Sequence, residues 1–136
     1  MPIPNVVRPV HEWRDPRHRR GLAGELAAAK YLEAQGWQIE AHRFRFGHHD
    51  LDLIARLGGL VAFVEVKARS GAAFGSGAES VGWRKRQILT LVAELWVVRR
   101  GRPSDQYRFD VIEVTWPRGV FPHVVHIEDA WRGVGK

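Results

Sequence analysis

Residues 50–69 read DLDLIARLGGLVAFVEVKAR, and this stretch decides the fold. Two apolar runs flank Gly58-Gly59, a dipeptide that is typical of the two-residue turn of a β-hairpin. If these glycines form the whole turn, Asp52 and Glu65 are direct cross-strand partners. A three-residue turn would shift the register by one residue and remove this arrangement.

The same register gathers charged side chains on one face of the hairpin. Asp50 lies opposite Lys67, and strand alternation places both on the face of Asp52 and Glu65. The opposite face is expected to be core and holds Leu51, Leu53, Val64 and Val66. Like charges opposite each other destabilise a strand pair, and burial adds a desolvation cost. A hard divalent cation, Mg²⁺ or Mn²⁺, would resolve this conflict. The alternative is a solvated polar face on which Lys67 pairs with the acids.

The segments around the hairpin predict an α/β sandwich, in which helices flank a mixed β-sheet. One helix is expected from Leu22 to a C-terminal glycine, Gly36. A longer helix is expected over Val81–Arg100, with an apolar stripe formed by Ile88, Leu91, Val92, Leu95 and Val98. The predicted strands are Trp37–Arg45, His48–Leu57, Leu60–Ala68, Tyr107–Val114 and Val120–Ile127. Pro122 restricts the last strand to an edge or a bend.

Length and composition indicate one domain. The 136 residues divide into a basic arm (1–20), an α/β domain (21–132) and a tail (133–136). The absence of cysteine excludes disulfides and thiolate zinc sites. Because no apolar run approaches the roughly 18 residues of a membrane span and the N-terminus has no signal core, a cytoplasmic protein without membrane contact is expected.

The net charge favours a polyanionic partner. Lys and Arg number 21 against 15 Asp and Glu, which gives +6. A partner that is a nucleic acid would account for this charge, whereas a GC-rich genome would account for the excess of Arg over Lys. The residues expected to contact phosphate are Arg69, after the hairpin, and Arg84, Lys85 and Arg86, at the start of the long helix.

Glu25 is a further acidic candidate, in the first helix. At about 100° per residue it falls between Leu32 and Ala29 on the apolar stripe. A carboxylate at this position is expected to point inward. Glu33 shares the arc, but it lies near the helix end, where it can reach solvent.

Several motifs resemble the YraN-like bacterial family of predicted endonucleases, which is akin to archaeal Holliday junction resolvases and to the PD-(D/E)xK nucleases. The motifs are Gly21-x-x-Gly24-Glu25, His49–Ile54, Phe63–Arg69, Arg108–Ile112 and His126–Trp131. The resemblance implies a restriction-endonuclease-like sandwich and a Mg²⁺- or Mn²⁺-dependent endonuclease. Its substrate would be DNA, including branched DNA such as Holliday junctions or flaps, and it would act as a homodimer.

The resemblance also assigns roles to residues. The catalytic set would be Glu25, Asp52, Glu65 and Lys67. Of these, Asp52, Glu65 and Glu25 would hold the metal, and Lys67 would orient or deprotonate the attacking water. Asp50 and Gln87 would be accessory. The family usually shows Gly-Glu-Ile-Asp where this chain has residues 49–52, His-Asp-Leu-Asp.

Two other functions fit the sequence. The departure at His49-Asp50 suggests a catalytically weak nucleic-acid-binding protein that keeps the fold. The same carboxylates would also serve a small-molecule hydrolase, although the basic charge argues against it. If a tryptophan stacks on bases, Trp13 in the basic arm is a better candidate than Trp83 or Trp96, which are expected in the core or an interface. His48 and His49 point to opposite faces of a strand and are not expected to share an ion.

Overall fold

The computed structural model describes Pro9, Trp13 and residues 19–70 and 81–133. Most of the predicted arm, the glycine-rich segment 71–77 and nearly all of the tail lie outside these residues. The helices and strands follow the predicted order and are α1 (Arg19–Ala34), β1 (Gln38–Phe46), β2 (His49–Leu57), β3 (Leu60–Ser70), α2 (Trp83–Arg100), β4 (Gln106–Trp116) and β5 (His123–Trp131).

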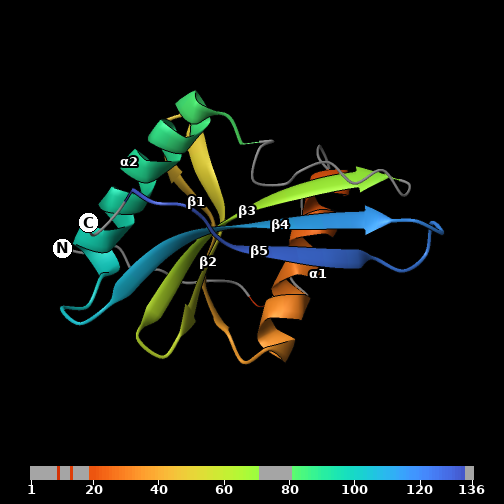
Figure 1. Cartoon of the computed structure of the whole chain (residues 1–136), viewed down its shortest axis with the longest axis horizontal. Coiled ribbons are helices and arrows are strands. Elements are labelled where there is room, and N and C mark those ends of the chain that lie inside the picture. Colours follow the sequence, from red (N-terminus) through yellow and green to blue (C-terminus); the bar gives the residue numbers. More distant parts are fainter. Residues whose placement is uncertain (1–8, 10–12, 14–18, 71–80, 134–136) are drawn as a thin grey trace.

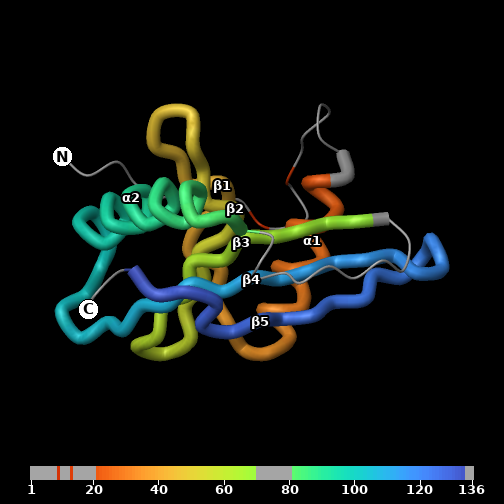
Figure 2. Tube along the Cα trace, turned by 45° about the horizontal axis from the view of Figure 1, so that its top comes forward, coloured from red at the N-terminus to blue at the C-terminus, as the bar shows by residue number. Residues whose placement is uncertain are grey.

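The strands form one mixed sheet in the order β1-β2-β3-β4-β5. Neighbouring strands are antiparallel, except that β3 and β4 are parallel and are joined through α2. The two helices lie on either side of the sheet (Figures 1 and 2). Alternate residues of β3 enter two separate cores: Val61 and Phe63 pack with α2, and Ala62 and Val64 pack with α1. The predicted α/β fold with a mixed sheet between helices is confirmed.

The end of α1 fixes where β1 begins. Gly36 has a φ of +93°, which a residue with a Cβ rarely adopts. The amide of Gly36 donates to the carbonyl of Glu33, and the amide of Trp37 donates to that of Leu32, both at 3.0 Å. This pair of bonds is the Schellman motif, so the role predicted for Gly36 is confirmed.

The hairpin has the predicted register. Leu57 pairs with Leu60 across Gly58-Gly59, and the ladder continues to Leu53 opposite Val64. In the structure this is the last pair of the ladder. The prediction that Asp50 and Lys67 form a cross-strand pair is therefore wrong. Asp50 instead pairs with Arg45 of β1. The two strands part at the level of Asp52 because β2 remains paired with β1 while β3 continues beside β4.

The apolar stripe predicted for the long helix is wrong in most of its members, and only Val92 of the predicted five is buried. The buried residues of α2 are Leu89, Val92, Ala93 and Trp96. Leu91 and Val98 are 61% and 84% exposed. The predicted stripe and the buried stripe both repeat at helical spacing. The stripe that faces the sheet is the one that carries the large indole of Trp96. No helix in the described part of the chain is long and apolar enough to cross a membrane.

Candidate active site

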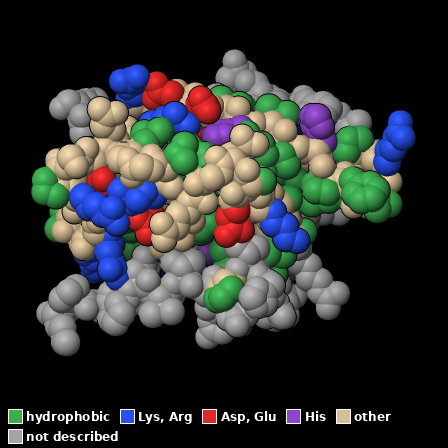
Figure 3. All heavy atoms as spheres, turned by 90° about the horizontal axis from the view of Figure 1, so that it is seen from below, with side chains coloured by type: hydrophobic (Ala, Val, Ile, Leu, Met, Phe, Trp, Pro, Cys, Tyr) green, Lys and Arg blue, Asp and Glu red, His purple; other side chains and the backbone are tan. Residues whose placement is uncertain are grey.

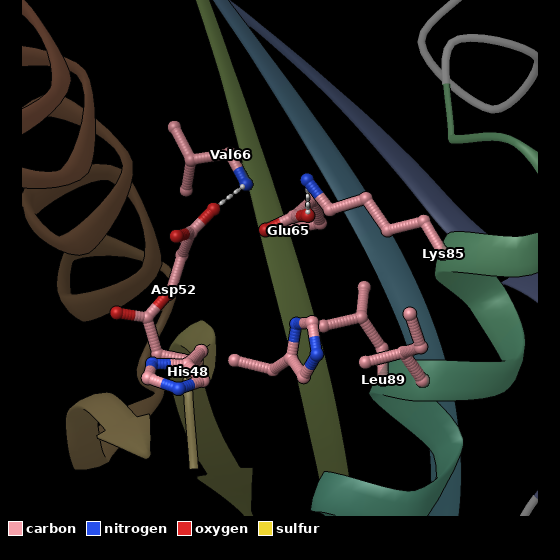
Figure 4. Close-up of a pocket in the computed structure, with 9 residues that line it drawn as sticks. His48, Asp52, Glu65, Val66, Lys85 and Leu89 are labelled. Atoms are coloured by element: carbon pink, nitrogen blue, oxygen red, sulfur yellow. Dashed lines mark hydrogen bonds and ion pairs between the residues drawn. The ribbon is translucent and has the colours of Figure 1, made fainter. Parts of the chain in front are cut away.

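The candidate site lies where β2 and β3 part (Figure 4). Asp52 lies one residue before Leu53, the β2 member of the last ladder pair. The amide of Val66 on β3 donates a 2.7 Å hydrogen bond to Oδ2 of Asp52. Glu65 is only 2% exposed. The sequence therefore predicted correctly that Asp52 and Glu65 would meet, although a side chain joins the strands here in place of a main-chain pair.

Glu65 perturbs the titration of Asp52. Burial raises the pKa of Asp52 well above its usual value, and contact with Glu65 and its charge raise it further. The Val66 amide opposes this rise only in part, and the charge of Glu25 adds to it. Burial and the neighbouring carboxylate therefore favour the protonated form of Asp52. A divalent cation would compete for the oxygens that hold this proton.

Two lysines complete the charge balance. Nζ of Lys85 lies 2.6 Å from Oε2 of Glu65, as an ion pair without the alignment of a hydrogen bond. Burial opposes the charge on Lys85, but contact with Glu65 outweighs it and raises its pKa. For Lys67, burial and then the nearby charge of Lys85 lower the pKa, and Glu65 offsets this only partly. Lys67 is thus the lysine that gives up its proton more readily.

Lys85 was expected to contact phosphate, and the structure places it beside Glu65, within the candidate site. Figure 4 shows its side chain reaching from α2 across to Glu65 on β3. Its sequence neighbours, Arg84 and Arg86, carry the same charge, so the sequence held no signal to separate Lys85 from them. The difference depends on how α2 crosses the sheet.

Glu25 points inward, as its position on the helix predicted, and is 6% exposed. Its Oε1 lies 2.5 Å from Nε2 of His42 and accepts a 2.8 Å hydrogen bond from Nε of Arg43. Consecutive strand residues normally face apart, but Arg43 has a φ of +55°, and this turns both side chains toward Glu25. Strand alternation gave no sign of these two partners.

The metal ligands implied by the resemblance are therefore only partly assembled. Among the described residues, no group of three or more His, Asp or Glu side chains is placed to hold a metal ion together. Asp52 and Glu65 are in contact, whereas Glu25 is engaged by β1. The two-carboxylate pair is the part of the predicted set that the structure brings together.

A pocket of about 490 Å³ opens beside the pair. Its lining residues come from β2, β3, α2 and the turn before β2, and they are His48, His49, Asp50, Asp52, Glu65, Val66, Lys85, Ile88 and Leu89. Asp50 borders this pocket with its carboxylate 3.9 Å from Arg45. The pocket gives a ligand access to carboxylates that are otherwise buried.

The other predicted contacts are dispersed. Arg84 is exposed and Arg69 is half-buried at the end of β3. Arg86 donates to the carbonyl of Val81 and lies 5.4 Å above the ring of Trp131, so it helps to anchor α2. Gln87 lines a different pocket, with Trp83 and Trp131. On the face seen in Figure 3, basic side chains form several groups with acidic side chains between them.

Trp13 is not an exposed stacking platform. It is 4% exposed and stacks on the ring of His42 at 3.5 Å between centroids. It therefore packs behind the residue that contacts Glu25. The predicted base-stacking role of Trp13 is wrong because the indole is buried in the core beside α1.

The comparisons with known proteins cover the whole site. Residues 24–114 match the model of a family described as "Uncharacterised protein family UPF0102". The chain is 42% identical over 108 residues to a UPF0102 protein of Nocardia farcinica, which covers 79% of this chain and 85% of the relative. It is 45% identical over 96 residues to a UPF0102 protein of Symbiobacterium thermophilum, which covers 71% of this chain and 81% of the relative. It is 36% identical over 137 residues to a UPF0102 protein of Bordetella avium, which covers 96% of this chain and 91% of the relative.

Proposed function

We propose that this chain, which belongs to the uncharacterised protein family UPF0102, is a metal-dependent endonuclease that hydrolyses phosphodiester bonds of DNA. One observation carries the proposal. The buried carboxylate of Glu65 and the half-buried carboxylate of Asp52 are in contact where two strands part, with Lys67 two residues further along and a pocket beside them. Carboxylates that desolvate and repel each other are costly for a fold, and this favours a functional reason for their presence.

The donor set fits Mg²⁺ or Mn²⁺. Mg²⁺ commonly binds through one or two carboxylates together with substrate phosphates and water, and it does not need a complete protein cage. Asp52 and Glu65 would be its ligands. Glu25 would remain with His42 and Arg43 and would not coordinate the metal. A bound cation would supply a polarised water and stabilise the charge that develops on the phosphate.

The lysines would then have separate tasks. Lys67, whose pKa is lowered, would orient the attacking water as an ammonium group or, once it has lost its own proton, accept the proton of the water. Lys85, whose side chain is 49% exposed, would leave Glu65 and contact a phosphate. The hydrogen bond from Val66 would hold Asp52 in one orientation throughout.

DNA is the proposed substrate because the chain carries a net charge of +6. Branched DNA is proposed as the preferred form, cut by a homodimer whose symmetry would match two cleavage points. The test is cleavage of end-labelled junction, flap and linear duplex DNA in Mg²⁺, in Mn²⁺ and in EDTA. The wild type is expected to cut only with metal.

Lys67→Ala should lower the cleavage rate by ~10²–10⁴-fold, the typical contribution of a positioned acid or base, while binding DNA with the same affinity. Lys30→Ala is the matched control because Lys30 is exposed on α1. If the two variants cleave equally well, Lys67 is not catalytic. If the wild type cuts no DNA under any condition, the proposed activity is wrong.

A second function is favoured by the charge balance of the site. Glu65 is neutralised by Lys85, and Glu25 by Arg43, without any metal. A nucleic-acid-binding protein that does not cleave could keep this arrangement. It would show DNA binding that weakens steeply with salt in the same assays, with no product in Mg²⁺ or Mn²⁺.

A further inference from the structure

Glu113 of β4 is a buried acid that the proposed mechanism does not use. It is 4% exposed, and its Oε1 has no hydrogen-bond partner in the part of the chain that the structure describes. Thr115, two residues further along the strand, is buried with its Oγ1 in the same condition. Buried carboxylates are nearly always paired, so this oxygen requires an explanation.

The sheet places Glu113 next to the candidate site. In the parallel ladder of β3 and β4, Glu113 is the register partner of Lys67. Val111 packs in the core beside α2, whereas Ile112 and Val114 pack in the core beside α1. Alternation therefore sets Glu113 on the α2 face, which also carries Glu65 and Lys67.

Neighbouring strands lie only about 4.8 Å apart, so the side chains of Lys67 and Glu113 start from adjacent points on one face. An acid and a base in such a position normally form a cross-strand pair. The ammonium of Lys67 is instead attracted by Glu65 and Asp52. The Oε1 atom of Glu113 has no hydrogen-bond partner among the described residues, and it belongs to the ladder partner of a lysine that the charges of Glu65 and Asp52 attract.

A divalent cation on Asp52 and Glu65 would reverse this attraction, because it would repel both ammonium groups. Lys85 is half-exposed on a helix and can move into solvent. Lys67 is half-buried on a central strand, and its ladder partner Glu113 offers an oxygen that has no hydrogen-bond partner among the described residues. We propose that Glu113 is a positioning residue, which accepts the ammonium of Lys67 when a divalent cation occupies the Asp52–Glu65 pair. This inference rests on the metal site of the proposed function.

The direct test compares crystal structures of the full chain grown in EDTA and in Ca²⁺ or Mn²⁺. With the cation bound, Nζ of Lys67 is expected within ~3.2 Å of the Glu113 carboxylate, and in EDTA it should lie toward Glu65. If Lys67 stays with Glu65 in both, or if Glu113 itself ligates the cation, the proposal is overturned. Absence of any cation from Asp52 and Glu65 would overturn the proposal and the metal site together.

Kinetics give a second, separate test. Glu113→Gln should lower kcat by ~10–100-fold, as expected for a residue that orients a catalytic group, with KM and the Kd for Mn²⁺ unchanged. Glu113→Asp should recover part of the loss. Glu94→Gln, on the exposed side of α2, is the control and should behave as wild type.

A weaker Kd for Mn²⁺ with kcat intact would make Glu113 a ligand and contradict the inference. An inactive wild type would refute the endonuclease, but the two crystal structures would still decide whether Lys67 moves to Glu113. The two crystal structures of the wild type would also decide this question if the Glu113 variants failed to fold.

Discussion

The main-chain amide of Val66 donates a 2.7 Å hydrogen bond to Oδ2 of Asp52. This bond lies just beyond Leu53 and Val64, the last pair of the β2–β3 ladder. A carboxylate thus takes the place of a main-chain acceptor where the strands separate. One oxygen of Asp52 is fixed by the sheet, and the rest of the carboxyl group faces Glu65 and the pocket.

Asp52→Asn should stabilise the metal-free protein at neutral and alkaline pH. The pKa of Asp52 is raised in the fold, so the stability that its protonated form contributes is lost as the pH rises through the raised pKa. Asparagine can accept the same hydrogen bond and does not ionise. Melting temperatures in EDTA should therefore favour the variant at pH 8, and the difference should shrink toward pH 4.

Asp105→Asn is the control, and it should change the stability in the opposite direction from Asp52→Asn. Asp105 pairs with Arg56 at 2.7 Å, and the contact with Arg56 lowers the pKa of Asp105. Its replacement should destabilise the protein at neutral pH, with a gap that closes as the pH falls below 3.8, its usual value. A loss of stability for Asp52→Asn at pH 8 would instead mean that its charge is satisfied by the fold.

Lys85→Gln should strengthen the binding of Mn²⁺. The substitution removes a positive charge 2.6 Å from a proposed ligand oxygen, and the gain should be about 3–10-fold because the lysine is half-exposed and screened. Isothermal titration calorimetry measures it. Arg84→Gln removes the same charge from an exposed neighbour and should change the affinity much less. Equal effects for the two variants would place the cation elsewhere.

Asp110→Asn should cost about 3 kcal/mol of unfolding free energy at pH 7. Asp110 is fully buried and accepts hydrogen bonds from Arg108 at 2.9 and 3.0 Å and from the amide of Asp129 at 3.0 Å, with Nε2 of His126 at 2.7 Å. Burial works against its charge, but these partners outweigh it and lower the pKa of Asp110. Its contribution is present above pH 3.8 and is lost as the pH falls through the lowered pKa.

Urea unfolding checks the Asp110 prediction. Asp50→Asn is the matched control, because its carboxylate is 35% exposed and 3.9 Å from Arg45, and it should cost less than about 1 kcal/mol. A cost for Asp110→Asn as small as that of the control would show that Arg108 and His126 are satisfied by solvent.

Gly24→Ala should destabilise the protein although alanine is the better helix former. A Cβ at this position would lie 2.6 Å from Cβ of Ala68 on β3, so α1 would have to move away from the sheet. The overpacking should cost about 1–3 kcal/mol, against about 1 kcal/mol gained in helix propensity. Glu33→Ala, exposed in the same helix, should be nearly neutral. A stabilised Gly24→Ala would show that the helix shifts freely.

Local patterns predicted most of the fold. The period of two on either side of Gly58-Gly59 gave the hairpin register, and Gly36 gave the end of α1. Asp52 and Glu65 followed from that register, and the inward direction of Glu25 followed from its helical phase. These features depend on neighbours in the sequence or on one turn.

The remaining features depend on how elements pack. For α2, the choice between two apolar stripes is made by the sheet beneath it, and this choice also sends Lys85 to Glu65. The partners of Glu25 depend on the positive φ of Arg43. The importance of Glu113 appears only once β4 lies parallel to β3, a pairing that the hairpin does not specify.

The length of the Gly58-Gly59 turn sets which residues of β2 and β3 face each other at the site. It lies six residues from Asp52 on one strand and six from Glu65 on the other, about 20 Å away along the sheet. A Cβ at Gly58 would touch nothing within 4 Å, so the turn has room for other side chains, at the cost of a φ of +61°. One inserted residue, however, would set Asp52 against the opposite face of β3. What the chemistry requires of this remote turn is therefore its length, and its composition matters only so far as it preserves that length.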